Sequence, residues 1–198
     1  GLDNSTITGD YTIGIKSEWL SLVGDVFGRY ISGIAGDYLF HSVPYYSMSE
    51  EDLELEEFNK LGEQASQGCV RLAVSDAKWV YDNCPTGTNV SIYDDAENAG
   101  PLGKPDAIKI TDFTNKWDPT DSNKKCPYAK ATPIISGAND YTIKSGGEFY
   151  ALAGVTAVDT CGNDITPNIE VFGNVVTTRK GKYKVTYSVT DVLKRTSS

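Results

Sequence analysis

The sequence predicts a mainly β protein of two domains, and three observations support this. A chain of 198 residues fits one large domain or two small ones. Its charge is unevenly divided, because residues 1–104 carry a net −11 and residues 105–198 a net +2, within a total of −9. The second half also consists of short alternating runs separated by Gly, Asn and Pro. We therefore expect residues 1–128 to form a β-sandwich with one or two helices, and residues 129–198 to form a smaller β-sandwich.

Charge and hydropathy narrow the range of functions. The acidic first domain lacks the clustered cations that bind phosphates, so we expect no nucleic-acid partner. No apolar run approaches the roughly 18 residues of a membrane helix, and no signal-peptide pattern opens the chain. The chain as given is expected to be soluble, with a first domain suited to neutral or amine-bearing ligands.

Three segments of the first domain have the character of β-strands. They are GDYTIGI (9–15), YLFHSVPYY (38–46) and TNVSIYD (88–94). In the first segment Tyr11, Ile13 and Ile15 would share one face, and Pro44 would end the second.

Two helices are predicted between the second and third of these strands. The first covers residues 47–62: Ser49 can cap it, acidic residues fill its first turn, and Gly62 follows its end. Its apolar residues, Phe58 among them, form only a partial stripe, which predicts a helix at the surface.

The second helix, residues 75–85, has the clearest helical pattern of the chain. Ser75 is its predicted N-cap, Pro85 closes it, and Val74 could pack on Trp79 across the first turn. Apolar residues recur along it at helical spacing: Ala77, Val80, Tyr81 and Cys84.

The second domain is predicted to be β throughout. Residues 97–105 and 116–128 are rich in turn formers, which places a domain boundary near residue 129. Four strand-like runs follow: 140–149, 154–159, 169–173 and 182–191. In the last run one face would carry Tyr183, Val185, Tyr187 and Val189.

The cysteine and histidine pattern does not predict a metal site. Cys69, Cys84, Cys126 and Cys161 form no C-x-x-C pair, and His41 is the only histidine. We expect neither a metal nor another cofactor.

The stretch SQGCVRL, residues 66–72, poses the main question of function. A nucleophilic cysteine needs a base, since a free thiol has a pKa of about 8.5, and backbone N–H groups that hold the developing oxyanion. Most lone cysteines are packing residues. Cys69, however, follows small residues that permit a tight turn, and His41 ends an apolar strand just before Ser42 and a proline turn.

These residues resemble the L,D-transpeptidase catalytic domain of the YkuD type. Its signature is a histidine, a spacer, and S-H-G-C followed by a hydrophobic residue and Arg or Asn. The match is carried by FHSVPYY, by LGEQASQGCVRLAVSDAKWVYDNCPTGTNVSIYD, and by TITGDYTIG, which is similar to the family's T-P-T-G strand. It covers roughly residues 6–128 and places the sole histidine and the candidate cysteine together on the pattern.

The resemblance implies roles for individual residues. Cys69 would be the nucleophile, His41 the general base, and the backbone carbonyl of Ser42 the group that orients the imidazole. Five further residues would bind substrate or lie near the oxyanion: Gly68, Gln67, Ser66, Arg71 and Tyr30. Arg71 would meet a substrate carboxylate or serve only as a structural ion pair.

The resemblance also implies a reaction and its partners. Family members attack the amide before D-Ala in a peptidoglycan stem tetrapeptide, release D-Ala and pass the acyl group to an amine of another stem, which makes a 3→3 cross-link. Carbapenem-type inhibitors would acylate the same cysteine. The expected location is outside the cell, in a bacterial cell wall.

Three departures keep other readings open. Gln67 stands where the signature has a second histidine, 28 positions separate His41 from Cys69, and only residues 1–5 precede the T-P-T-G-like strand, so the family's first strands are missing. An incomplete sheet would invite strand swapping or a homo-oligomer. The rival functions are a wall-binding module that has lost catalysis and a cysteine peptidase of the same fold.

The C-terminal segment from Asn139 to Asp191 resembles bacterial Ig-like repeats. That family continues into one more strand, so VLKRTSS (192–198) is expected to be a cut-off or rewired end. Outside the cell a disulfide between Cys126 and Cys161 would pin this domain to its linker. Cys84 is expected to be a buried thiol and Cys69 to stay free.

Overall fold

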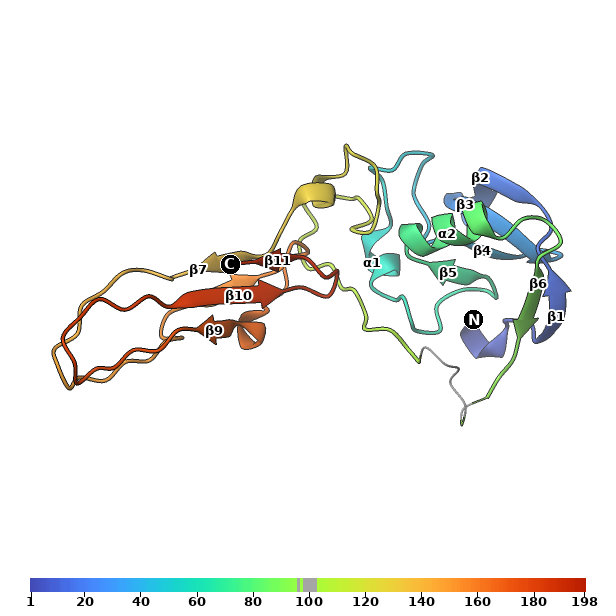
Figure 1. The fold of residues 1–198 in the computed structure, drawn as a ribbon. Helices are drawn as coiled ribbons and strands as arrows, with labels where there is room; N and C mark the ends of the chain where they lie inside the picture. Colours follow the sequence, from blue (N-terminus) through green and yellow to red (C-terminus); the bar gives the residue numbers. More distant parts are fainter. Residues whose placement is uncertain (96, 98–102) are drawn as a thin grey trace. The chain divides into compact units, whose positions relative to one another are not determined.

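The computed structural model describes residues 1–95, 97 and 103–198, and it divides them into two compact units. The first unit is Gly1–Ala129 and the second is Lys130–Ser198 (Figure 1). The fold is mainly β with two α-helices, which confirms the predicted fold class. In the described part of the chain, no helix has the length and apolar character needed to cross a lipid bilayer.

A four-stranded sheet in the order β2-β3-β4-β5 forms the centre of the first unit. Its strands are β2 (Lys16–Leu22), β3 (Val26–Ala35), β4 (Tyr38–Ser42) and β5 (Val70–Leu72). The first three are antiparallel neighbours joined by tight turns. β5 runs parallel to β4 and pairs Phe40 with Val70, His41 with Arg71, and Ser42 with Leu72. This pairing brings the SQGCVRL stretch to the strand that carries the histidine.

A separate two-stranded ribbon pairs β1 (Gly9–Thr12) with β6 (Asn89–Ile92). The predicted common face of residues 11, 13 and 15 is wrong, because Ile13 is buried whereas Ile15 is 64 % exposed. The chain leaves β6 at this point: Ile13 still donates to Thr88, but Gly14 donates to Gly33 of β3. Changing partner between two strands breaks the alternation that a single ladder would impose.

Helix α2 (Val74–Asn83) lies where a helix was predicted, and it packs on the sheet against Tyr30 of β3. Its start differs from the prediction. The N-cap position is Ala73, and the free amide of Val74 donates 2.8 Å to the carboxylate of Asp118 instead. Trp79 is 61 % exposed, so most of its ring lies in solvent, and its contact with Val74 across the first turn stays a prediction.

The first predicted helix is reduced to α1 (Leu55–Phe58), and its surface position is wrong because Phe58 is fully buried. The segment before α1 is held by other partners: Leu53 bridges to Tyr45 and donates to the carbonyl of Lys116. Ser49 only accepts a bond from Glu51 within a turn. Long-range pairing therefore replaces the helical bonds that the acidic, capped sequence would favour.

The second unit contains two small sheets. β7 (Ile134–Ser136) pairs with β8 (Thr156–Val158), and β10 (Thr186–Thr190) lies between β9 (Glu170–Phe172) and β11 (Thr196–Ser197). Its core contains Val155, Ala157, Ile169 and Val189. Three of the four predicted runs contain these strands. The fourth, 140–149, contains no strand and has a turn at Ser145 and Gly146, so the prediction of a strand there is wrong. The end of the chain forms the short β11.

Short 3₁₀ helices complete the fold: η1 (Leu2–Asn4), η2 (Pro127–Lys130) and η3 (Thr166–Asn168). Residues 116–128 are irregular, as predicted, apart from the start of η2. Most of the other predicted turn region, 97–105, lies outside the described residues.

Candidate active site

His41 lies in the middle of the central sheet, on β4, and is only 2 % exposed. Its Nδ1 is 2.5 Å from the carbonyl oxygen of Ser42. A carbonyl can only accept, so Nδ1 carries the proton and Nε2 keeps its lone pair. The neighbouring residue thus selects the tautomer in which Nε2 can act as a base.

A glycine on the adjacent strand makes room for the imidazole. A Cβ placed on Gly28 of β3 would lie 3.1 Å from Nδ1 of His41 and 3.0 Å from Cδ1 of Ile31. Both distances are shorter than an ordinary carbon contact, so a side chain here would press on the ring. Gly28 therefore helps to set the position of the imidazole.

Burial keeps His41 uncharged at neutral pH. Desolvation lowers its pKa from 6.5 to about 4, the bond to Ser42 works against this, and the positive charge of Arg71 adds to the lowering. The ring is therefore an unprotonated base under physiological conditions.

Cys69 lies one residue before β5, and its thiol donates 3.5 Å to the carbonyl oxygen of Asp37. Burial raises the pKa of Cys69. A backbone hydrogen bond at Leu39 and the charge of Arg71 lower the pKa, but by less, so the net shift is upward. No hydrogen bond joins the thiol to the His41 ring in the described part of the chain. The resting pair is a neutral thiol and a neutral imidazole, and catalytic hydrogen bonds often tighten only when substrate binds.

The loop before Cys69 is closed by Ser66. Its hydroxyl donates 2.7 Å to the carbonyl of Cys69 and accepts a 3.2 Å bond from the Gly68 amide. Gly68 has φ +135°, and a Cβ there would lie 2.6 Å from Cε1 of Tyr38. Only glycine fits this conformation and this contact. Gln67, between them, is exposed to solvent.

Arg71 forms an ion pair with α1. Its Nη1 lies 2.5 Å from Oε2 of Glu57, whose other oxygen lies 2.5 Å from Nζ of Lys60. Burial raises the pKa of Glu57, but bonds from Lys60 and Arg71 outweigh it and lower the pKa overall. The buried Nε of Arg71 has no hydrogen-bond partner among the described residues.

A small cavity joins these groups. It has a volume of about 210 Å³, and Ser66, Cys69, Arg71 and Glu57 line it. His41 lies behind it in the sheet: His41 and Arg71 are paired in register, so their side chains share one face. Leu72, on the opposite face, packs towards α2. The cavity and the base therefore belong to the face that α1 borders.

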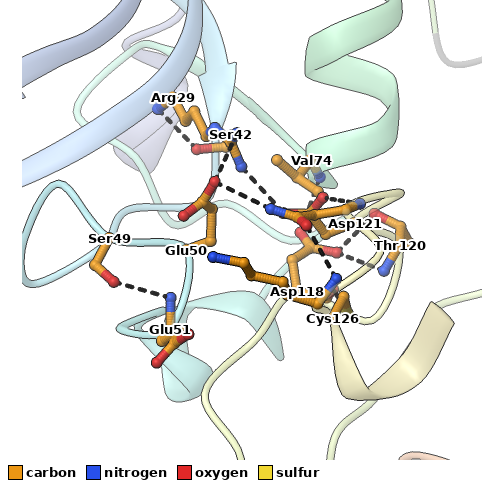
Figure 2. A network of polar contacts seen from close by, with 12 residues as sticks. Arg29, Ser42, Ser49, Glu50, Glu51, Val74, Asp118, Thr120, Asp121 and Cys126 are labelled. Carbon is orange, nitrogen blue, oxygen red and sulfur yellow. Dashed lines mark hydrogen bonds and ion pairs between the residues drawn. The ribbon is translucent and has the colours of Figure 1, made fainter.

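Ser42 is anchored from the α2 side by a buried polar network (Figure 2). Its hydroxyl accepts a hydrogen bond of 2.9 Å from the Arg29 amide and donates one of 2.8 Å to the Val43 carbonyl. The Arg29 guanidinium is bound by Asp121 at 3.0 Å and by Glu50 at 3.1 Å. This network fixes the strand whose carbonyl orients His41.

Asp118 supports the same region at the N-terminal end of α2. It is fully buried, and its oxygens accept from the amides of Val74 and Thr120 and from the Thr120 hydroxyl. Burial raises its pKa to about 6, although these bonds lower it. Sequence reasoning missed Arg29, Asp118 and Asp121. The only local signal was the D-P-T-D pattern, typical of Asp-centred turns.

Three of the sequence-predicted residues line the cavity: Cys69, Ser66 and Arg71. His41 and Ser42 lie on the paired strand β4, and Gly68 and Gln67 lie in the loop before Cys69, but none of these four is among the lining residues. Tyr30 is also absent from the lining, because it packs against Val74 and Ala77 of α2. Glu57 lines the cavity but was expected only as part of an acidic helix.

None of the four cysteines forms a disulfide. The expected bridge between Cys126 and Cys161 is absent: each is buried within its own unit, and the Cys126 thiol donates to the Asp118 carbonyl. Cys69 is a free thiol, as predicted. Cys84 is the C-cap residue directly after α2. It is half-buried, so its thiol is less enclosed than expected.

Comparison with known families confirms the resemblance seen in the sequence. Residues 2–92 match the L,D-transpeptidase catalytic domain family, YkuD. Residues 133–197 match the family described as bacterial surface protein, Ig-like domain.

One curated relative is a protein of Bacillus subtilis (strain 168) named "Putative L,D-transpeptidase YciB". It is 49 % identical over 57 residues, which are 29 % of this chain and 28 % of the relative. The match thus spans less than a third of that protein.

Solved structures of three proteins are similar over about half of this chain. A fused Zn-dependent amidase/peptidase/peptidoglycan-binding domain-containing protein from Clostridium acetobutylicum ATCC 824 is 36 % identical, covers 47 % of this chain and 36 % of its own, and has a TM-score of 0.35. An L,D-transpeptidase (Yku) from Stackebrandtia nassauensis is 18 % identical, with coverage of 48 % and 42 % and a TM-score of 0.36. The LD transpeptidase LdtMt1 in complex with imipenem is 17 % identical, with coverage of 47 % and 45 % and a TM-score of 0.37.

Proposed function

We propose that this protein is an active L,D-transpeptidase with Cys69 as nucleophile, because residues 2–92 match the YkuD L,D-transpeptidase catalytic domain and residues 133–197 match a bacterial surface Ig-like domain. It acts on peptidoglycan stem peptides outside the cell, in the cell wall. His41 is its general base, and the Ser42 carbonyl orients the imidazole.

The reaction balances with these groups alone. Nε2 of His41 takes the thiol proton as the Cys69 sulfur attacks the carbonyl carbon of the donor amide. The amide C–N bond breaks, the leaving D-Ala amine takes the proton, and a thioester remains on Cys69. An amine of a second stem then attacks the thioester, and the thiol is restored as the 3→3 cross-link forms.

The observation that carries this proposal is the bond between Nδ1 of His41 and the Ser42 carbonyl on the strand beside the cysteine. It holds the imidazole in one tautomer with Nε2 unprotonated, while burial keeps the ring neutral. The oxyanion would be held by backbone N–H groups near Gly68 and Cys69.

Arg71 supplies the cation for a substrate carboxylate. It lines the cavity with Cys69, and its Nε has a proton without a partner among the described residues. Glu57 already occupies its Nη1, so the arginine is also a structural ion pair. A substrate carboxylate would bind the remaining donors or displace Glu57. Ser66 and the exposed Gln67 border this entrance, and carbapenem-type inhibitors would acylate Cys69 from it.

A second copy of the chain can complete the sheet. Among the described residues β2 pairs only with β3, so its outer edge is available to another strand. We retain a strand-swapped or homo-oligomeric contact here as part of the proposal. Light scattering across a concentration series would show a monomer at all concentrations if this contact does not form.

Product analysis tests the proposed activity. The protein is incubated with a stem tetrapeptide, with and without an amine-bearing acceptor stem, and products are identified by mass spectrometry. The proposal predicts cross-linked product and released D-Ala when the acceptor is present. Tripeptide formed by hydrolysis alone would identify a peptidase, and intact tetrapeptide retained by the protein would identify a wall-binding module.

A further inference from the structure

The second unit contains a groove that the catalytic proposal does not use. It has a volume of about 770 Å³ and lies between residues 138–149 and residues 175–187. Figure 1 shows these segments as long ribbons that run from the strands of the unit to a common end. There the Gly146 amide donates 2.8 Å to the Thr177 carbonyl.

Aromatic rings with accessible faces line the groove. Tyr141 and Phe149 are stacked with their centroids 5.9 Å apart, and Tyr141 is nevertheless 59 % exposed. Tyr183 and Tyr187 line the groove from the other segment; Tyr183 is exposed, whereas Tyr187 also packs against the core of the unit. Their hydroxyls donate to backbone carbonyls, which holds these two rings in place. Fixed, exposed rings are suited to stacking on a flat ligand face.

Cationic side chains line the same groove. Arg179, Lys180 and Lys182 contribute to it, against Asp140 as the one acidic residue of its lining. None of the three cations forms an ion pair with any described residue. All three side chains are exposed, so their charges are available to a bound anion.

We infer that this groove binds a glycan polymer that carries carboxylate or phosphate groups. The C–H faces of sugar rings stack on the tyrosines, and the acidic groups pair with Arg179, Lys180 and Lys182. The groove has a volume of about 770 Å³ and is lined by two chain segments, which is room for several sugar units of a chain. The match of this unit to a bacterial surface family favours wall glycans over nucleic acid.

Binding measurements on the whole chain test this inference. The protein carries Cys69→Ala, so that no turnover interferes, and calorimetry compares hexagalacturonate, a phosphorylated mannan oligosaccharide, neutral cellohexaose, hexaglutamate and hexathymidylate. We expect the two acidic glycans to bind at least about tenfold more tightly than the other three. The tighter of the two acidic glycans identifies carboxylate or phosphate as the preferred group.

Variants separate stacking from charge. Tyr141→Leu and the pair Arg179→Gln and Lys182→Gln should each weaken binding about tenfold, whereas Tyr141→Phe retains it. Lys124→Gln with Lys130→Gln is the matched control, since both lysines are exposed and outside the groove. Each variant is first checked for an unchanged unfolding temperature.

Three results would overturn the inference. Equal binding of hexaglutamate would indicate simple ion exchange, and preference for hexathymidylate would indicate a nucleic-acid site. No measurable binding of either acidic glycan would show that the groove has another use. None of these outcomes depends on whether Cys69 is catalytic.

Discussion

The Nδ1 nitrogen of His41 donates its hydrogen to the carbonyl oxygen of Ser42, 2.5 Å away and hidden from solvent. The two residues are neighbours in β4, so the strand itself supplies both the base and the group that orients it. The backbone amide of Arg29 donates to the Ser42 hydroxyl, and Asp121 in turn binds the Arg29 guanidinium.

Stability should depend on pH through His41. Its pKa falls from 6.5 to about 4 on folding, so below pH 6.5 the unfolded chain binds more protons than the folded one. The free energy of unfolding is therefore highest, as far as His41 contributes, above pH 6.5. It decreases as the pH falls towards 4, by up to about 3 kcal/mol. Urea denaturation should show that the free energies of unfolding of the protein and of His41→Gln converge as the pH is lowered across this range. A constant difference between them would contradict the burial of a neutral imidazole.

Gly28→Ala should impair the imidazole position more than the fold. The added methyl group would lie 3.1 Å from Nδ1 of His41, so the ring must shift away from its bond with Ser42. We expect acyl transfer to fall about tenfold to a hundredfold, because small misplacements of a base are costly. Gly14→Ala is the control, since its methyl group would meet only the Gly33 oxygen at 3.9 Å. Equal rates in the two variants would show that Gly28 has no positioning role.

Asp118→Asn should destabilise the first unit. The carboxylate accepts bonds from Val74 at the start of α2 and from Thr120, and an amide can replace only one of its two oxygens. An unsatisfied buried donor costs about 1–3 kcal/mol of unfolding free energy, measurable by urea denaturation. Asp112→Asn, at an exposed position, should change stability by less than about 0.5 kcal/mol. Comparable losses in the two variants would contradict the buried cap.

Gln67→His should leave the reaction type unchanged. Gln67 is exposed, and its amide cannot take a proton at neutral pH, so it is not the base. His41 already supplies an unprotonated imidazole with a fixed tautomer. Product analysis of the variant should therefore show the same products as the parent protein. If activity appeared only in the variant, the parent protein would be a wall-binding module.

The residues of the candidate site could be proposed from the sequence because they occupy short motifs. His41 with Ser42, and Gly68 with Cys69, are recognisable wherever the intervening chain folds. Their supports could not be predicted, because Asp118 and Arg29 act on partners 44 and 13 positions away, respectively. No local pattern encodes which amide a distant carboxylate will reach.

The helices show the same difference between local signals, which could be predicted, and long-range contacts, which could not. α2 was predicted from its apolar spacing and its closing proline, which are local signals. The segment before α1 has equally good local helix signals, yet Leu53 pairs with Tyr45 and Lys116 instead. Tertiary pairing overrides propensity there because it buries Leu53 and Phe58 completely.

The measurement that tests the central claim most directly is the mass of the protein after reaction with a carbapenem, followed by digestion to locate the adduct. We predict one adduct, on the peptide that contains Cys69, none in Cys69→Ala, and a rate at least about a hundredfold lower in His41→Gln, because we propose that the imidazole is the general base. The unfolding temperature of each variant checks that the fold is retained. An adduct on another residue, or an unchanged acylation rate in His41→Gln, would contradict the assignment of Cys69 and His41.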